Sequence, residues 1–132
     1  MTRSINVSFE ITDNWEIDGF RNYIKFLMSN DDYNVFIISN DDSTAYINSI
    51  AEQLGLPSSN VIVCNFTDDK TQAIIDNRID IHFDNLQSFI LLVDETTDAY
   101  GILVSQNLNK FYMQPDYAIT FDRLVRRIRT DE

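Results

Sequence analysis

Cysteine and histidine are scarce in this sequence, which has one of each among 132 residues. The single cysteine, Cys64, excludes an internal disulfide and a zinc site built from cysteines of one chain. With only three glycines and two prolines, neither a P-loop nor a dinucleotide-binding glycine motif can be assembled. Cys64 falls in an apolar run, NVIVCNF, where we expect a core residue in a reducing compartment.

Basic residues and long apolar runs are also few. The net charge is −11, from 10 basic and 21 acidic residues, which argues against a nucleic-acid partner because phosphate backbones are bound by Lys and Arg. No apolar run approaches the ~20 residues that cross a membrane, and the start lacks the pattern of a secretory signal. We therefore expect a cytoplasmic protein with no membrane partner.

Strand and helix patterns alternate along the chain. Residues 4–12 alternate apolar and polar side chains, and apolar runs at 34–39, 60–66, 78–84 and 99–105 indicate four further strands. Helical spacing of apolar residues lies between them and near the C-terminus. The pattern predicts one α/β domain over residues 1–132, with a doubly wound, mostly parallel five-stranded sheet and helices on both faces.

Ligands bind such sheets at the carboxyl ends of the strands. Each of these predicted strands either ends in polar residues or is followed by a helix that begins with them. The candidate site residues at these positions are Ser8, Glu10, Ser39, Lys70, Asp84 and Asn85.

This series resembles the haloacid-dehalogenase-like phosphatase superfamily. Members place Asp-x-Asp-x-Thr at the end of the first strand, Ser or Thr after the second, Lys near the start of the helix after the third, and paired acids after the fourth. Ser39, Lys70 and the pair Asp84–Asn85 match the last three motifs. About 30 residues separate the first two motifs, so the resemblance implies a compact domain without a large cap.

The first motif departs from the family. Ser8 stands at the nucleophile position, Glu10 at the acid–base position and Thr12 at the terminal threonine. The family's aspartyl-phosphate chemistry needs a carboxylate where Ser8 stands, and a serine hydroxyl is a weak nucleophile without a base. The loss also weakens the Mg²⁺ site, which keeps mainly Asp84, with Asn85. Our leading hypothesis is a non-catalytic or nearly inactive member that binds a phosphorylated small molecule or a protein partner.

Three alternatives stay open. In the first, a Mg²⁺-dependent phosphohydrolase uses Glu10 or Asp13 to attack or to activate water, while Ser39 and Lys70 hold phosphate and Asp84 holds the metal. In the second, the pocket is a relic in a pure interaction protein. The third is a receiver-like signalling domain, with acids after the first and third strands. A content rich in Asn, Asp, Ile and Tyr also fits an AT-rich coding source such as a phage or a small-genome bacterium.

Each site residue also has a purely structural interpretation. Ser8 and Glu10 would then form the polar face of a half-exposed strand, Lys70 would be a solvated helix lysine, and Asp84 would cap a helix. His82 alternates with its apolar neighbours, so it faces away from them, and we expect a structural role rather than a general base or a Ser-His-Asp triad.

The four arginines near the C-terminus have two interpretations. We expect them to form the solvated face of a terminal helix, near the negative end of its dipole. The alternative is a surface that docks phosphate or a partner. The cluster consists of Arg123, Arg126, Arg127 and Arg129.

Overall fold

The chain folds into alternating strands and helices, as the sequence pattern predicts. The computed structural model describes residues 3–11, 18–40, 44–104 and 116–131. The strands are β1 (Ile5–Phe9), β2 (Tyr33–Ser39), β3 (Val61–Val63), β4 (Ile81–Asp84) and β5 (Tyr100–Leu103). The helices are α1 (Asp18–Met28), α2 (Thr44–Leu54), α3 (Thr67–Asp76), α4 (Gln87–Thr96) and α5 (Asp116–Thr130), with a 3₁₀ turn, η2 (Ser58–Asn60), before β3.

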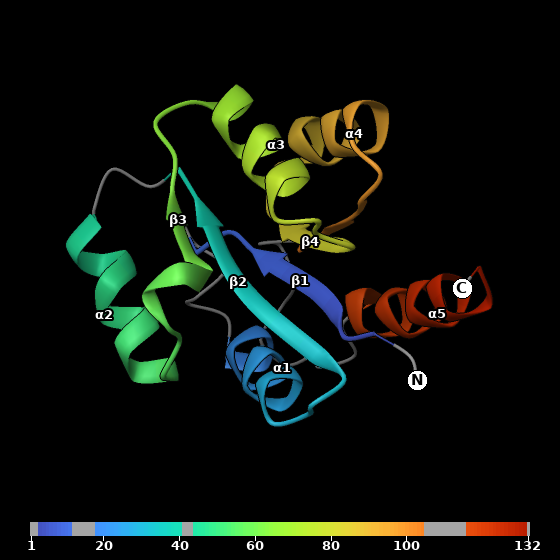
Figure 1. Ribbon diagram of the computed structural model, residues 1–132, viewed down its shortest axis with the longest axis horizontal. Coiled ribbons are helices and arrows are strands. Elements are labelled where there is room, and N and C mark those ends of the chain that lie inside the picture. Colours follow the sequence, from blue (N-terminus) through green and yellow to red (C-terminus); the bar gives the residue numbers. More distant parts are fainter. Residues whose placement is uncertain (1–2, 12–17, 41–43, 105–115, 132) are drawn as a thin grey trace.

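All five strands are parallel, and they lie side by side in the order β3-β2-β1-β4-β5 (Figure 1). This is the Rossmann-type order through five strands, whereas receiver-like domains use 2-1-3-4-5. The receiver-like alternative is therefore wrong, because its sheet would place β1 between β2 and β3. The direction of winding reverses between β1 and β4, and this switch point is where doubly wound sheets bind ligands.

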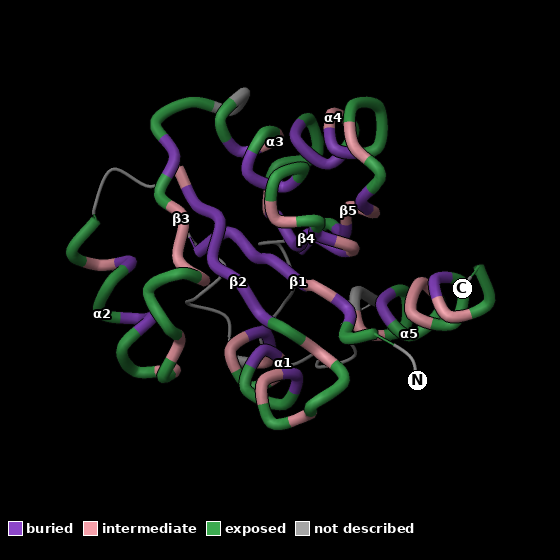
Figure 2. The backbone as a smooth tube through the Cα atoms, in the orientation of Figure 1, coloured by how far each residue is buried: buried purple, intermediate pink, exposed green. Residues whose placement is uncertain are grey.

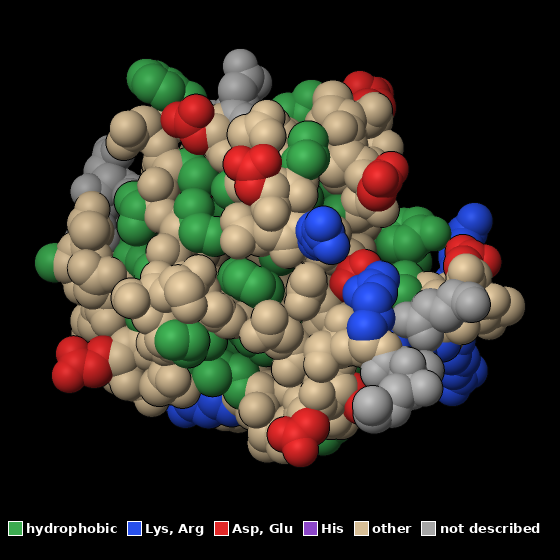
Figure 3. All heavy atoms as spheres, viewed as in Figure 1, with side chains coloured by type: hydrophobic (Ala, Val, Ile, Leu, Met, Phe, Trp, Pro, Cys, Tyr) green, Lys and Arg blue, Asp and Glu red, His purple; other side chains and the backbone are tan. Residues whose placement is uncertain are grey.

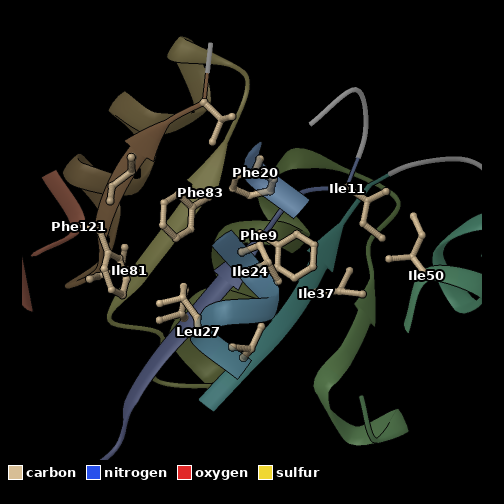
Figure 4. Packing of buried hydrophobic residues seen from close by; sticks show 14 of the residues in the cluster. Phe9, Ile11, Phe20, Ile24, Leu27, Ile37, Ile50, Ile81, Phe83 and Phe121 are labelled. Carbon is tan, nitrogen blue, oxygen red and sulfur yellow. The ribbon is translucent and has the colours of Figure 1, made fainter. Parts of the chain in front are cut away.

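Helices cover both faces of the sheet. On one face, α1, α2 and α5 pack apolar side chains against the strands, and Figure 4 shows Phe9, Phe20, Phe83 and Phe121 close together in this core. On the other face, α3 and α4 form a smaller core that includes Phe89. The central strands β1 and β2 are buried along most of their length (Figure 2), as expected for a parallel sheet between two helical layers.

Two glycines occupy positions that other residues fit poorly. Gly55 has φ of +72° just after α2, the left-handed conformation in which glycine commonly ends a helix. At Gly101 in β5, an added Cβ would lie 2.9 Å from Cγ2 of Ile90. The absence of a side chain there lets α4 approach the edge strand.

The C-terminal arginines lie mostly in solvent, as expected. Arg123, Arg126 and Arg127 are exposed on α5, and Figure 3 shows basic side chains gathered near this helix. Arg129 is less exposed, and its guanidinium donates a hydrogen bond to the carbonyl oxygen of Arg3. Among the described helices, none has the length and apolar character required to cross a bilayer.

Candidate functional site

A group of polar side chains is buried at the carboxyl ends of the central strands. Each is at most 2% exposed: Ser8, Glu10, Ser39, Lys70, His82 and Asp84. The polar-face interpretation of Ser8 and Glu10 is thus wrong, because the helical layer of α3 and α4 covers that side of β1. The interpretation of Lys70 as a solvated helix lysine is also wrong, because its side chain is 1% exposed and reaches from α3 to Asp84.

Lys70 lies at the centre of this group. It projects inward from the first turn of α3, and its Nζ lies 2.7 Å from Oδ2 of Asp84 and 3.6 Å from Oε1 of Glu10. The ammonium also lies 4.1 Å from the ring centroid of Phe89, a cation–π contact. Lys70 thus joins the residue just beyond β1 to the last residue of β4, so it lies at the switch point of the sheet.

Asp84 and His82 are tightly linked. The Nε2 of His82 lies 3.0 Å from Oδ2 of Asp84, and the backbone N–H of Leu86 donates to Oδ1 at 3.1 Å. Burial alone would raise the pKa of Asp84, but His82 and Lys70 outweigh it and lower that pKa to about 2. The N-cap of α4 is Leu86, and no side chain caps the helix there, so the interpretation of Asp84 as a helix cap is wrong.

Ser8 completes a chain of hydrogen bonds across two strands. It is the register partner of His82, and its Oγ lies 2.7 Å from Nδ1 of that ring. Burial lowers the pKa of His82, more than the hydrogen bond to Asp84 raises it, so the ring is neutral at pH 7. Asp84 is ionised and can only accept, so Nε2 carries the proton and the Ser8 hydroxyl donates to Nδ1.

The hydrogen-bonded series Ser8–His82–Asp84, here called the relay, has the connectivity of a Ser-His-Asp triad. The two ring nitrogens are exchanged: Ser8 contacts Nδ1 and Asp84 contacts Nε2, whereas in the proteases Ser contacts Nε2 and Asp contacts Nδ1. Ser8 and His82 are 0% exposed, so no substrate reaches the hydroxyl in this structure. As expected, His82 faces away from Ile81 and Phe83, which belong to the opposite core. Sequence reasoning missed its contact with Ser8, because that contact depends on the register of β1 against β4.

The remaining predicted residues lie around this group. Oε1 of Glu10 accepts a hydrogen bond from the N–H of Asn40 at 3.3 Å, and Oε2 accepts one from Ile11 at 3.2 Å. Ser39 is buried at the end of β2, and Asn85 is partly exposed after β4. Thr12 and Asp13 lie outside the described residues.

The carboxylates of Glu10 and Asp84 converge, and the group that they share is the ammonium of Lys70. Over the described ranges, no cluster of three or more His, Cys, Asp or Glu side chains is placed to hold a metal.

An open pocket of about 240 Å³ lies beside Lys70, at the start of α4. Its apolar walls are Leu86, Phe89 and Leu92, and its polar lining comes from Asn40, Ser88 and Lys70. The helical spacing of apolar residues in this segment would place Leu86 in one buried stripe with Phe89. In the structure Leu86 precedes α4, is 53% exposed and lines the pocket.

Comparison with known proteins finds no matching family model, no matching curated protein and no matching solved structure.

Proposed function

We propose that this chain is a non-catalytic or nearly inactive domain of the haloacid-dehalogenase-like type, which acts by binding a small molecule or a protein partner at the strand-end pocket. The order of the sheet and the positions of Ser39, Lys70 and Asp84 at its carboxyl edge support this proposal. So does Ser8, which stands where the family's mechanism needs a carboxylate and is instead hydrogen-bonded to His82.

One observation carries the proposal. The ammonium of Lys70, 1% exposed, is held between Asp84 and Glu10, so the charges that would hold phosphate and Mg²⁺ neutralise one another. With His82 neutral, the group sums to one positive and two negative charges, or −1. A phosphate dianion at the carboxyl ends of β1 and β4 would be repelled by this net negative charge. We also propose the cytoplasm as the compartment. The Cys64 thiol is buried and its pKa is raised by burial, which suits a cysteine that stays reduced.

The test is Mg²⁺-dependent release of phosphate from 4-nitrophenyl phosphate. We expect no turnover above that of an Asp84→Asn variant whose folding is checked by circular dichroism. The alternative of an atypical phosphohydrolase draws on the convergence of Glu10 and Asp84. It predicts turnover that requires Mg²⁺ and disappears in Asp84→Asn and in Glu10→Gln, and that result would overturn our proposal.

A further inference from the structure

The pocket beside Lys70 has the chemistry of a site for a neutral ring rather than for an anion. We infer that it binds a free small molecule through one uncharged aromatic ring that carries a short hydrogen-bonding group, as a phenol does. This inference rests on the proposed function, because it names the ligand class of the same pocket.

The walls select for an apolar body. Leu86, Phe89 and Leu92, all from α4 and the residue before it, provide the aliphatic and aromatic lining. A dry apolar cavity of about 150 Å³ accepts benzene, so a pocket of about 240 Å³ has room for a ring with a substituent. Burial of such a ring is favourable at roughly 25 cal/mol per Å² of apolar surface removed from water.

Two polar side chains of the pocket lining can orient the ligand through hydrogen bonds. Asn40 is partly buried and Ser88 is exposed, and both line the pocket. Among the described residues, neither the Asn40 amide nor the Ser88 hydroxyl is hydrogen-bonded to another protein group. An amide and a hydroxyl both donate and accept, so they match a phenolic hydroxyl without requiring a charge on the ligand.

The charges near the pocket argue against an ionic ligand. Lys70 lines the pocket, but its side chain is 1% exposed and its ammonium is bound by Asp84 and by the Phe89 ring. An anion would therefore gain little from Lys70 and would be repelled by the net charge of −1. Neither Glu10 nor Asp84 lines the pocket, so a cation would find no carboxylate there.

Phe89 connects the pocket to the buried relay. Phe89 lines the pocket, although it is only 3% exposed. Its ring contacts the Lys70 ammonium and packs edge-on against His82, with the centroids 5.5 Å apart. A ligand in the pocket would therefore be felt at His82 through the Phe89 ring. Because His82 is the single histidine, its imidazole signals report on the site without ambiguity.

The experiment is an NMR titration of the ¹⁵N-labelled full chain with 4-methylphenol. We expect saturable shifts of Asn40, Ser88 and the His82 ring, with a dissociation constant on the order of 1 mM for so small a ligand. Leu86→Ala should raise that constant about fivefold, because it removes part of one apolar wall. The matched control is Leu91→Ala, a residue of α4 that is 56% exposed against 53% for Leu86 and does not line the pocket.

Several outcomes would overturn the inference. They are the absence of saturable shifts in the folded wild-type chain, shifts that avoid the pocket, or equal weakening by Leu91→Ala. Phenyl phosphate is the charged counterpart, and we expect it to bind no more tightly than 4-methylphenol. Binding tenfold tighter would show that Lys70 reaches the ligand and would replace the neutral-ring inference with a phosphate site. Turnover of 4-nitrophenyl phosphate would refute the proposed function, whereas failure of 4-methylphenol alone would refute only the ligand class.

Discussion

Replacement of Lys70 by methionine tests the buried charge arrangement most directly. Methionine has nearly the length of lysine without its charge, so Lys70→Met removes the ammonium and leaves Asp84 and Glu10 buried without their shared cation. The group would change from a net charge of −1 to −2 at about 2% exposure or less. Breaking a buried ion pair by removal of one partner costs roughly 3–5 kcal/mol. That is a large part of the 5–15 kcal/mol by which such domains are stable.

Asp84→Asn provides the comparison, because it removes a negative charge from the same buried group where Lys70→Met removes the positive one. It keeps the shape and changes the net charge from −1 to 0, with Glu10 left as the partner of Lys70. The pKa of Asp84, about 2 against about 3.9 for an ordinary aspartate, corresponds to about 2–3 kcal/mol of stabilisation of the charged form. We therefore expect Asp84→Asn to lower the free energy of unfolding by about 2 kcal/mol, clearly less than Lys70→Met does.

Urea unfolding at pH 7 and pH 5, followed by circular dichroism, measures both variants. Loss of the ammonium removes one of the causes that hold the pKa of Asp84 low, so the buried carboxylate is protonated more easily. Lys70→Met should therefore regain stability, relative to wild type, as pH falls from 7 to 5. The control is Lys25→Met, at an exposed lysine of α1, which should change stability by no more than about 0.5 kcal/mol. A Lys70→Met cost below about 1 kcal/mol, or one smaller than that of Asp84→Asn, would refute the reasoning.

Further expectations concern the relay and the packing of α4. The His82 ring should remain the neutral Nε2–H tautomer in ¹⁵N NMR spectra well below pH 6.5, because burial lowers its pKa. The stability that comes from the neutral ring is fully present above the unfolded pKa near 6.5 and is lost as the pH falls through the lowered folded pKa. Titration of the ring at or above pH 6.5 would contradict the burial argument. Ser8→Ala leaves Nδ1 without its donor and should lower the free energy of unfolding by about 1–3 kcal/mol in urea; no loss would mean that the hydrogen bond is unimportant. Gly101→Ala forces its Cβ against Ile90, 2.9 Å away, and should cost about 1–3 kcal/mol, measured as a lower thermal midpoint; an unchanged midpoint would show that α4 shifts freely.

The fold was predictable from the sequence because two periodicities repeat cleanly along it. Alternation in residues 4–12 and apolar runs at the other strands predicted five strands, and all five are present. Four are shorter than predicted, whereas β2 begins one residue earlier than expected, at Tyr33. The ends differ because apolar residues continue past the last ladder hydrogen bond: Ile11 is fully buried, yet β1 ends at Phe9. Strand order did not follow from periodicity, since it depends on which crossovers pack together.

The site was predictable only in part. The positions of Ser39, Lys70 and Asp84 at one edge followed from their places after strands. The resemblance placed Lys70 in the site, but its ion pairs with Asp84 and Glu10 could not be predicted, because they depend on how α3 packs against the sheet. The Ser8–His82 contact required the register of β1 against β4, which brings together residues 74 positions apart.

The two sheet edges affect how copies of this chain meet in solution. β3 and β5 form the edges and contain only three and four residues. Long, flat edges are where sheets of separate molecules join and aggregate, and edges this short offer a second chain few backbone groups. A net charge of −11 adds mutual repulsion near neutral pH. Concentrated samples should therefore resist growth into extended β-structure until acid neutralises the surface carboxylates.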